Sequence, residues 1–438
     1  MLRTTITCLT LVAASCQGFG EFWKVSLELN QSEVNLLFGV PQKLQVTSTD
    51  AGSDFSWSSS DPDKVTVAAD GTVTARRTGT VIVTAKTTDE RRIGQAFVTV
   101  PRGQMFTLRG GTTTQAMLYD PIAGLFKALP ALTATAANGA SLHPIYQGPM
   151  QGKILVIHGG ATTTTSVFDP GTATFAAGPN LTSSANAGGH AFATGKGTIV
   201  CVLAGGSSMA TSVYDMNSNS FSAGPNLTDN AGAGSKTFPI TSGTQNGKFI
   251  TMHGNTVSTT SLFDPADSSY TTGPALPSGV AAGTNFLAVT TGASAGKTLI
   301  LHGNSAATSL YNPTNNTFAA TGNATTNINN GASAFLINAG TNAGKYFIIH
   351  GNSGNLTSIS DSTADITGWL GGQSMPFTSG AGSHVFRVAT GLYAGKLMVL
   401  YNSGTTTSLF DDASDSFSNG PQMAMGGVGL GAATLEIP

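Results

Sequence analysis

The chain has 438 residues, of which 10% are charged, and its formal net charge is −2. This length allows two or more domains, and the lack of a strongly basic segment argues against binding to DNA or RNA. The 55 glycines fall at regular positions between apolar runs, which is typical of many tight turns rather than of disorder.

Residues 1–15 have the pattern of an export signal: one positive charge, an apolar run too short to anchor in a bilayer, and small residues at the end. The stretch VAASC resembles a bacterial lipobox, although Ala13 stands where that family usually has leucine. The resemblance implies cleavage and acylation of Cys16, so that lipid chains hold the protein at a membrane surface and residues 16–24 act as a linker. Plain cleavage near Ser15, which would release a soluble secreted protein, is the alternative.

Residues 25–101 contain short runs of alternating residues that are rich in Val, Ile and Thr and separated by turn signals. Six or seven strands at this spacing predict a β-sandwich. The segment FSWSSSDPDKVTVAADGTVTARRTGTVIVTAK resembles the bacterial immunoglobulin-like domain of group 2, and the resemblance covers nearly all of residues 25–101. It implies a spacer domain of a surface protein, without catalytic residues, in which Trp57 packs in the core.

Residues 102–438 contain seven copies of one unit. Each copy has an apolar strand such as GKILVIHGG, and in six copies a glycine follows that strand at intervals of 49, 46, 49, 49 and 48 residues. These glycines are Gly110, Gly159, Gly205, Gly254, Gly303 and Gly351. Because each copy holds four strand-like runs, the repeat predicts seven four-stranded blades of a β-propeller.

The two ends of the repeat region predict how the ring closes. The first copy begins at its second strand, whereas the chain ends in GVGLGAATLEI, which matches the first strand of the other copies. We therefore expect residues 428–437 to pair with residues 105–108, which would leave no open sheet edge. The order of strands and turns is similar to the kelch repeat, although Phe or Tyr replaces the usual Trp after the Asp-Pro turn and Gly-Gly becomes Gly-Asn in three later copies. The expected fold is all-β: an Ig-like sandwich and a seven-bladed propeller closed by the C-terminal strand.

A histidine occupies the same position of the repeat in four copies, as His158, His253, His302 and His350. Imidazole is a common metal ligand, and a propeller places equivalent residues on a ring. The other copies have Arg109, Ala204 and Tyr401 at this position, and residues of different blades are separated by the blade spacing unless they lie at the axis. We therefore expect each histidine to hydrogen-bond a neighbouring turn, with a metal site as the alternative, and we predict no cofactor.

The first strand of each copy is expected to line the central channel. Polar residues fall near its start: Ser141, His190, Lys236, Asn285, Ser333 and His384. We interpret them as a candidate binding site at the channel mouth, with a water-filled mouth as the alternative. The Asp residues that end the third strand of most copies are expected to cap turns, and the lysines of the GK pairs to be solvated.

The sequence contains no GxSxG, HExxH or P-loop motif, and Cys201 lies within an apolar strand. We therefore expect a non-enzymatic protein, exported and lipid-anchored at the cell envelope, in the outer membrane or at the surface. Its propeller would bind a protein or a glycan, as an adhesin-like or antigenic lipoprotein. The domain combination resembles bacterial surface lipoproteins, including some from spirochaetes. The alternatives are a propeller enzyme, either a metal-dependent oxidase or a glycan-active enzyme, and a purely structural envelope protein.

Overall fold

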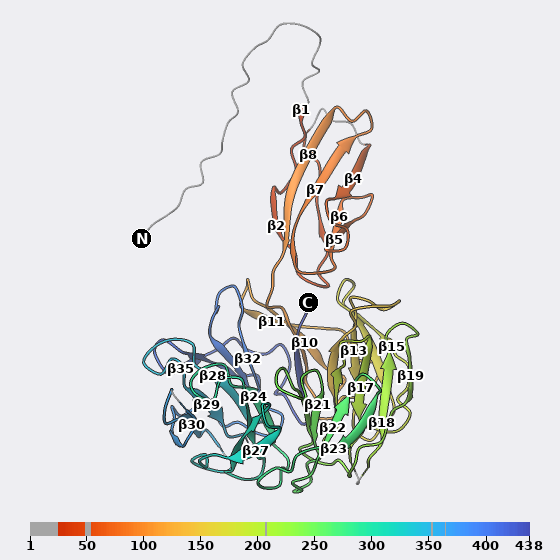
Figure 1. Ribbon diagram of the computed structural model, residues 1–438. Coiled ribbons are helices and arrows are strands. Elements are labelled where there is room, and N and C mark those ends of the chain that lie inside the picture. Colours follow the sequence, from red (N-terminus) through yellow and green to blue (C-terminus); the bar gives the residue numbers. More distant parts are fainter. Residues whose placement is uncertain (1–24, 49–53, 206–207, 352–353, 364) are drawn as a thin grey trace.

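The computed structural model describes residues 25–48, 54–205, 208–351, 354–363 and 365–438. In these residues an elongated N-terminal domain stands on a ring-shaped C-terminal domain, and the regular elements are all β-strands (Figure 1). The expected export signal, Cys16 and linker lie outside the described residues. Within the described part of the chain, no helix is long and apolar enough to cross a membrane.

The N-terminal domain consists of two facing sheets. One has the order β1-β8-β7-β4, with β2 also paired to β8, and the other has the order β3-β6-β5. Along β7 every second side chain is buried, so that Val81, Val83 and Ala85 enter the core. Trp57 is partly buried and packs against the same core, as the sequence predicts. The strands are β1 (Val25–Ser26), β2 (Glu33–Asn35), β3 (Gln42–Lys43), β4 (Phe55–Ser59), β5 (Val65–Val67), β6 (Thr72–Ala75), β7 (Gly79–Thr87) and β8 (Arg92–Val100).

The C-terminal domain contains seven four-stranded antiparallel sheets, which are the blades of a propeller. Blade 1 consists of β36 (Ala433–Glu436), β9 (Met105–Leu108), β10 (Ala116–Asp120) and β11 (Leu125–Ala128). Blade 2 consists of β12 (Ser141–Pro144), β13 (Ile154–Ile157), β14 (Thr165–Asp169) and β15 (Thr174–Ala177). Blade 3 consists of β16 (His190–Ala193), β17 (Thr198–Val202), β18 (Thr211–Asp215) and β19 (Ser220–Ala223). Blade 4 consists of β20 (Lys236–Pro239), β21 (Phe249–Met252), β22 (Thr260–Asp264) and β23 (Ser269–Thr272).

The remaining blades repeat this order. Blade 5 consists of β24 (Asn285–Ala288), β25 (Thr298–Leu301), β26 (Thr308–Asn312) and β27 (Thr317–Ala320). Blade 6 consists of β28 (Ser333–Leu336), β29 (Tyr346–Ile349), β30 (Thr357–Ser360) and β31 (Trp369–Gly371). Blade 7 consists of β32 (His384–Arg387), β33 (Leu397–Leu400), β34 (Thr407–Asp411) and β35 (Ser416–Asn419). The first strands of most neighbouring blades contact one another, which places these strands innermost, around the axis.

The predicted ring closure is confirmed. Strand β36 pairs with β9 in antiparallel register, from Ala433 opposite Leu108 to Glu436 opposite Met105. The C-terminal strand is therefore the inner strand of blade 1. Blades 1 and 7 also pack face to face, because Met117 and Tyr119 share one buried apolar cluster with Phe386 and other residues of blade 7.

The two domains share a continuous apolar core. Buried residues of the Ig-like domain, such as Phe38 and Ala75, belong to the same cluster as Phe106 and Phe168 of blades 1 and 2. The fully buried Gln104 adds a polar tie: its Oε1 accepts a hydrogen bond from the Phe38 N–H at 3.0 Å, and its backbone carbonyl accepts one from Ile437 at 2.9 Å. The junction is therefore a packed interface.

This arrangement gives the propeller two distinct faces. The Ig-like domain leads directly into β9 at Met105, and β36 ends beside it, beneath the Ig-like domain (Figure 1). We call this the proximal face and the opposite one the distal face. Since β36 runs toward the proximal face, the repeat places the start of every inner strand on the distal face.

Candidate functional site

A cavity of about 210 Å³ lies at the distal mouth of the central channel, enclosed by all seven blades. Four of the six residues predicted to line this mouth do so: Lys236, Asn285, Ser333 and His384. At the other two positions, Ser141 and His190, the lining comes from the preceding residues, Ala140 and Gly189. The structure thus brings residues from distant copies of the repeat to one site.

Three of the predicted residues link neighbouring inner strands. His190 bonds Thr237 of the next blade through Nε2 at 2.7 Å, and Asn285 donates to the Ala332 carbonyl at 3.1 Å. His384 donates through Nε2 to the carbonyl of Ala432 at 2.6 Å. Burial lowers the pKa of His190 to about 3 and that of His384 to about 4, and the charge of Lys236 acts in the same direction. Both imidazoles are therefore neutral at physiological pH.

The rim of the cavity is built from seven equivalent turns that sequence reasoning missed. In each turn the fourth residue donates its N–H to the carbonyl of the first at 2.6 to 3.0 Å, and the third residue is a glycine with φ between +81° and +96°. This is the geometry of a type II turn, in which glycine suits the positive φ. These glycines are Gly139, Gly188, Gly234, Gly283, Gly331, Gly382 and Gly431. The sequence does carry a pattern that could have predicted these turns: a glycine stands one or two residues before every inner strand.

The turns also pack head to tail around the ring. A Cβ atom added to any of the seven glycines would lie 1.8 to 2.3 Å from a backbone atom of the first residue in the next blade's turn. Gly431, in the C-terminal segment, completes the ring against Ala137. Each glycine is therefore required twice: for its backbone conformation and for the close approach of the next blade.

The four repeat histidines lie buried inside their own blades. His158, His253, His302 and His350 each place Nε2 2.7 Å from the Oγ of a serine on the adjacent strand: Ser166, Ser261, Ser309 and Ser358. Tyr401 contacts Ser408 in the same way at 2.6 Å. The predicted contact with a neighbouring turn is made by the other ring nitrogen in three of the four: Nδ1 lies 2.8 to 3.0 Å from Thr164 in His158, from Thr259 in His253 and from Ser278 in His302. Among the described residues, no three His, Cys, Asp or Glu side chains come together as a metal site would require.

Three of these serines also connect their blade to the preceding one. Ser261 contacts Thr228, at 2.8 Å, and Ser358 contacts Thr325, at 2.6 Å; both threonines lie in the linker that leaves the preceding blade. Ser166 contacts Thr133 in the same way. Burial of a histidine is acceptable here because the ring nitrogen and the serine satisfy each other. The histidines therefore stabilise blade packing.

The buried histidines predict an acid-sensitive fold. Burial lowers the pKa of His158 from 6.5 to about 4, so the unfolded chain binds the proton first as the pH falls. Stability is therefore expected to decline between about pH 6.5 and pH 4, seen as a falling melting temperature. His158→Gln should reduce that decline. The control is Asp264→Asn. Because the pKa of Asp264 in the folded protein is lowered from 3.8, this substitution should change the stability only at pH values below the range in which His158 acts. An unchanged pH profile in His158→Gln would contradict the assignment.

The aspartates at the ends of the third strands cap turns on the proximal face. Asp120, Asp215, Asp264 and Asp411 each accept a backbone N–H two residues further on at 2.8 to 3.0 Å, and Asp169 does the same. The GK lysines expected to be solvated instead pair with these caps in three blades: Lys153 with Asp169, Lys248 with Asp264 and Lys396 with Asp411, at 3.1 to 3.4 Å. In each pair the lysine lies just before the second strand of a blade and the aspartate ends the third, so the strand register places them opposite each other.

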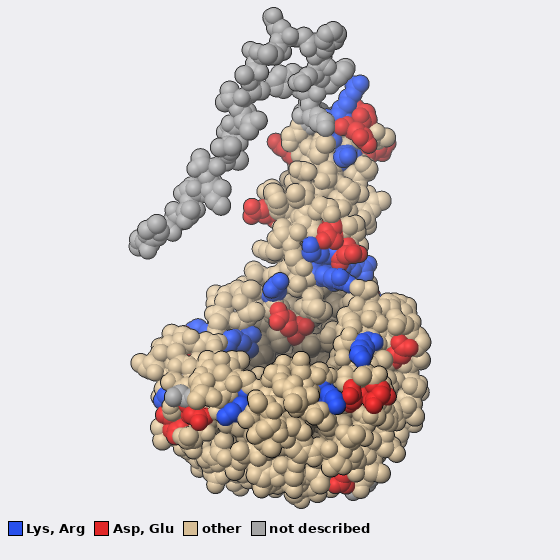
Figure 2. All heavy atoms as spheres, in the orientation of Figure 1, with Lys and Arg blue, Asp and Glu red and all other residues tan. Residues whose placement is uncertain are grey.

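The distal face carries very little charge. The loops that form it, between the second and third strands and before each inner strand, contain only two charged residues, Arg109 and Asp229. Asp229 accepts a hydrogen bond from Thr259, and Arg109 donates to the Gly427 carbonyl. Gly, Thr, Ser, Asn and Ala make up most of the remainder. In the view of Figure 2, the charged side chains of the propeller gather near the junction and along the rim that faces the Ig-like domain.

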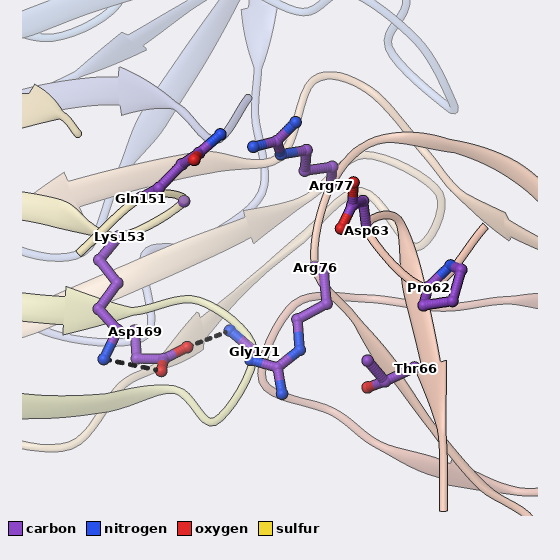
Figure 3. Close-up of a pocket in the computed structure, with 10 residues that line it drawn as sticks. Pro62, Asp63, Thr66, Arg76, Arg77, Gln151, Lys153, Asp169 and Gly171 are labelled. Carbon is purple, nitrogen blue, oxygen red and sulfur yellow. Dashed lines mark hydrogen bonds and ion pairs between the residues drawn. The ribbon is translucent and has the colours of Figure 1, made fainter. Parts of the chain in front are cut away.

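A second cavity, of about 350 Å³, lies at the junction between the domains. Figure 3 shows Arg76 and Arg77 of the Ig-like domain facing Gln151, Lys153 and Asp169 of blade 2. Lys153 and the Gly171 N–H already engage the Asp169 carboxylate at 3.4 and 2.9 Å. The Arg76 guanidinium lies against Gly171, where an added Cβ would come within 3.0 Å of its Nη1. These polar contacts continue the packed interface between the domains.

Residues 25–96 match the family model of the bacterial Ig-like domain (group 2). No curated protein matches the chain. Solved structures that align with it include a "putative 6-phosphogluconolactonase" from Bacteroides fragilis NCTC 9343, with 10% identity, 77% of this chain and 98% of that chain covered, and a TM-score of 0.46. A protein of the same description from Bacteroides uniformis ATCC 8492 aligns with 11% identity, 76% and 100% coverage, and a TM-score of 0.47. The match to the group 2 bacterial Ig-like domain thus covers the N-terminal domain, over residues 25–96, and does not extend to the propeller.

Proposed function

We propose that this protein is an exported lipoprotein of the bacterial envelope that binds a protein or glycan partner through the distal face of a kelch-like propeller. Acylated Cys16 would anchor the chain. The Ig-like domain would act as a spacer, because residue 25 begins it at the end remote from the propeller (Figure 1). The distal face would then point away from the membrane.

The observation that carries this proposal is the composition of the distal face. It is rich in hydroxyl and amide groups, nearly free of charge, and centred on a cavity. Such groups pair well with the hydroxyls and amides of a partner, and a face with few charges loses little desolvation energy on binding. The cavity lining includes no acidic residue, whereas glycoside hydrolysis usually uses a pair of carboxylates. This favours binding over glycan cleavage.

The test is a screen of residues 17–438 against immobilised matrix proteins and a glycan array, followed by two matched variants. Leu430 is 39% exposed beside the distal cavity, and Leu392 is 63% exposed on the proximal face. Leu430→Arg should weaken binding of a partner found in the screen, and Leu392→Arg should leave it unchanged. Equal affinities of the two variants, or no partner in the screen, would contradict the proposal. Palmitate labelling that Cys16→Ala abolishes would support the anchor.

A further inference from the structure

The distal cavity contains a positive charge that the protein does not neutralise. Lys236, the first residue of β20, lines the cavity and is half-buried. No described residue forms an ion pair or hydrogen bond with its ammonium group. Desolvation lowers its pKa below 10.5, as expected for a cation without a counter-charge. The neighbouring His190 and His384 are neutral, so Lys236 is the charged group of the lining.

The rim adds backbone donors around this charge. The N–H groups of the seven turn glycines have no acceptor within the described residues, and all seven glycines line the cavity. Asn138 and Asn330 also line it, and their side-chain amides have no hydrogen-bond partner among the described residues. A polar donor that lacks a partner in the protein must be satisfied by water or by a ligand. The cavity therefore offers many hydrogen-bond donors and one cation.

We propose that the distal cavity binds a carboxylate group, held by the Lys236 ammonium and the surrounding N–H donors. This inference rests on the proposed function and specifies the chemistry of its partner. A single cation matches a singly charged anion, whereas phosphate sites commonly combine several donors with Arg or a metal ion. The volume of about 210 Å³ is below the usual 300–1,000 Å³ of a drug-sized site, so it suits the end of a chain. A sugar acid or the C-terminus of a peptide would present such a group.

The proposal is tested by calorimetric titration of residues 17–438 with two pairs of small probes. Glucuronate is compared with glucose, and acetyl-Ala-Ala with its amide. The carboxylate of at least one pair should bind at millimolar concentration, and its neutral counterpart at least about 10-fold more weakly. The pair that binds identifies the source of the carboxylate. Failure of both carboxylates to bind, or equal binding of the neutral probes, would overturn the proposal.

Variants of two lysines in blade 4 complete the test. Lys236→Gln should weaken carboxylate binding by about 10- to 100-fold, while Lys236→Arg should retain part of it. Lys248→Gln is the matched control, because Lys248 lies on the proximal face, 3.2 Å from Asp264. Wild-type affinity in Lys236→Gln would overturn the proposal. If a macromolecular partner binds Lys236→Gln as tightly as the wild type and is not displaced by glucuronate, the proposed function stands and this inference is rejected. If the carboxylate probes bind but no macromolecular partner is found, this inference stands and the proposed function is rejected.

Discussion

Deletion of residues 427–438 is expected to lower the melting temperature of the propeller by about 7 °C. The deletion removes the inner strand of blade 1 and leaves β9 with an open edge. Val428 and Ile437 are at most 1% exposed, and burial of such side chains is worth about 1.5–3 kcal/mol each. With the lost backbone hydrogen bonds, the deletion is expected to cost about 5 kcal/mol. In a domain as long as residues 102–438, each kcal/mol lowers the melting temperature by roughly 1.4 °C, because the unfolding entropy grows with chain length.

Scanning calorimetry of the full chain and of the deletion variant measures this effect. Removal of Pro438 alone is the control, since this residue is exposed and follows the last paired strand. A synthetic peptide of residues 427–438, added in excess, should restore part of the lost stability by re-forming β36. A deletion variant that melts like the full chain would show that the ring does not depend on its C-terminal closure.

The blade count and the closure could be predicted because both depend on patterns within one repeat. Four apolar runs in 46 to 49 residues define a blade wherever they occur, and the final GVGLGAATLEI matched the strand missing from the first copy. The channel mouth could be predicted in part for the same reason: the start of an inner strand is recognisable, and Lys236 and His384, which stand there, line the cavity.

Contacts between blades and between domains could not be predicted in this way. The serine that binds His253 is in the same repeat, but its threonine partner, Thr228, belongs to the preceding copy. Nothing in a linear pattern shows which turns approach each other across the ring. The domain junction is a further case. Gln104 links the domains only because the fold places Phe38 and Ile437 beside it, and these residues are far from it in the sequence. The sequence repeat therefore predicts the four-stranded blade, whereas the contacts that a blade makes with other blades and with the Ig-like domain depend on the three-dimensional packing.

Two glycines of blade 4 separate the effect of backbone conformation from that of close packing. Gly234 and Gly247 both have φ of +85°. A Cβ at Gly234 would lie 1.9 Å from the Ala281 carbonyl oxygen, whereas a Cβ at Gly247 would meet nothing within 4 Å. Gly247→Ala should therefore cost only the strain of a non-glycine residue at positive φ, about 1–3 kcal/mol. Gly234→Ala should cost about 1–3 kcal/mol more, because the neighbouring blade must shift.

Urea unfolding of the two alanine variants measures this difference directly, because the backbone term is common to both. A clearly larger loss in Gly234→Ala would show that the glycine ring holds neighbouring blades at a distance that no Cβ permits. Equal losses would mean that glycine is needed at the rim only for its turn conformation. In that case the rim could open without cost to blade packing, and its N–H groups would no longer be a rigid array around Lys236.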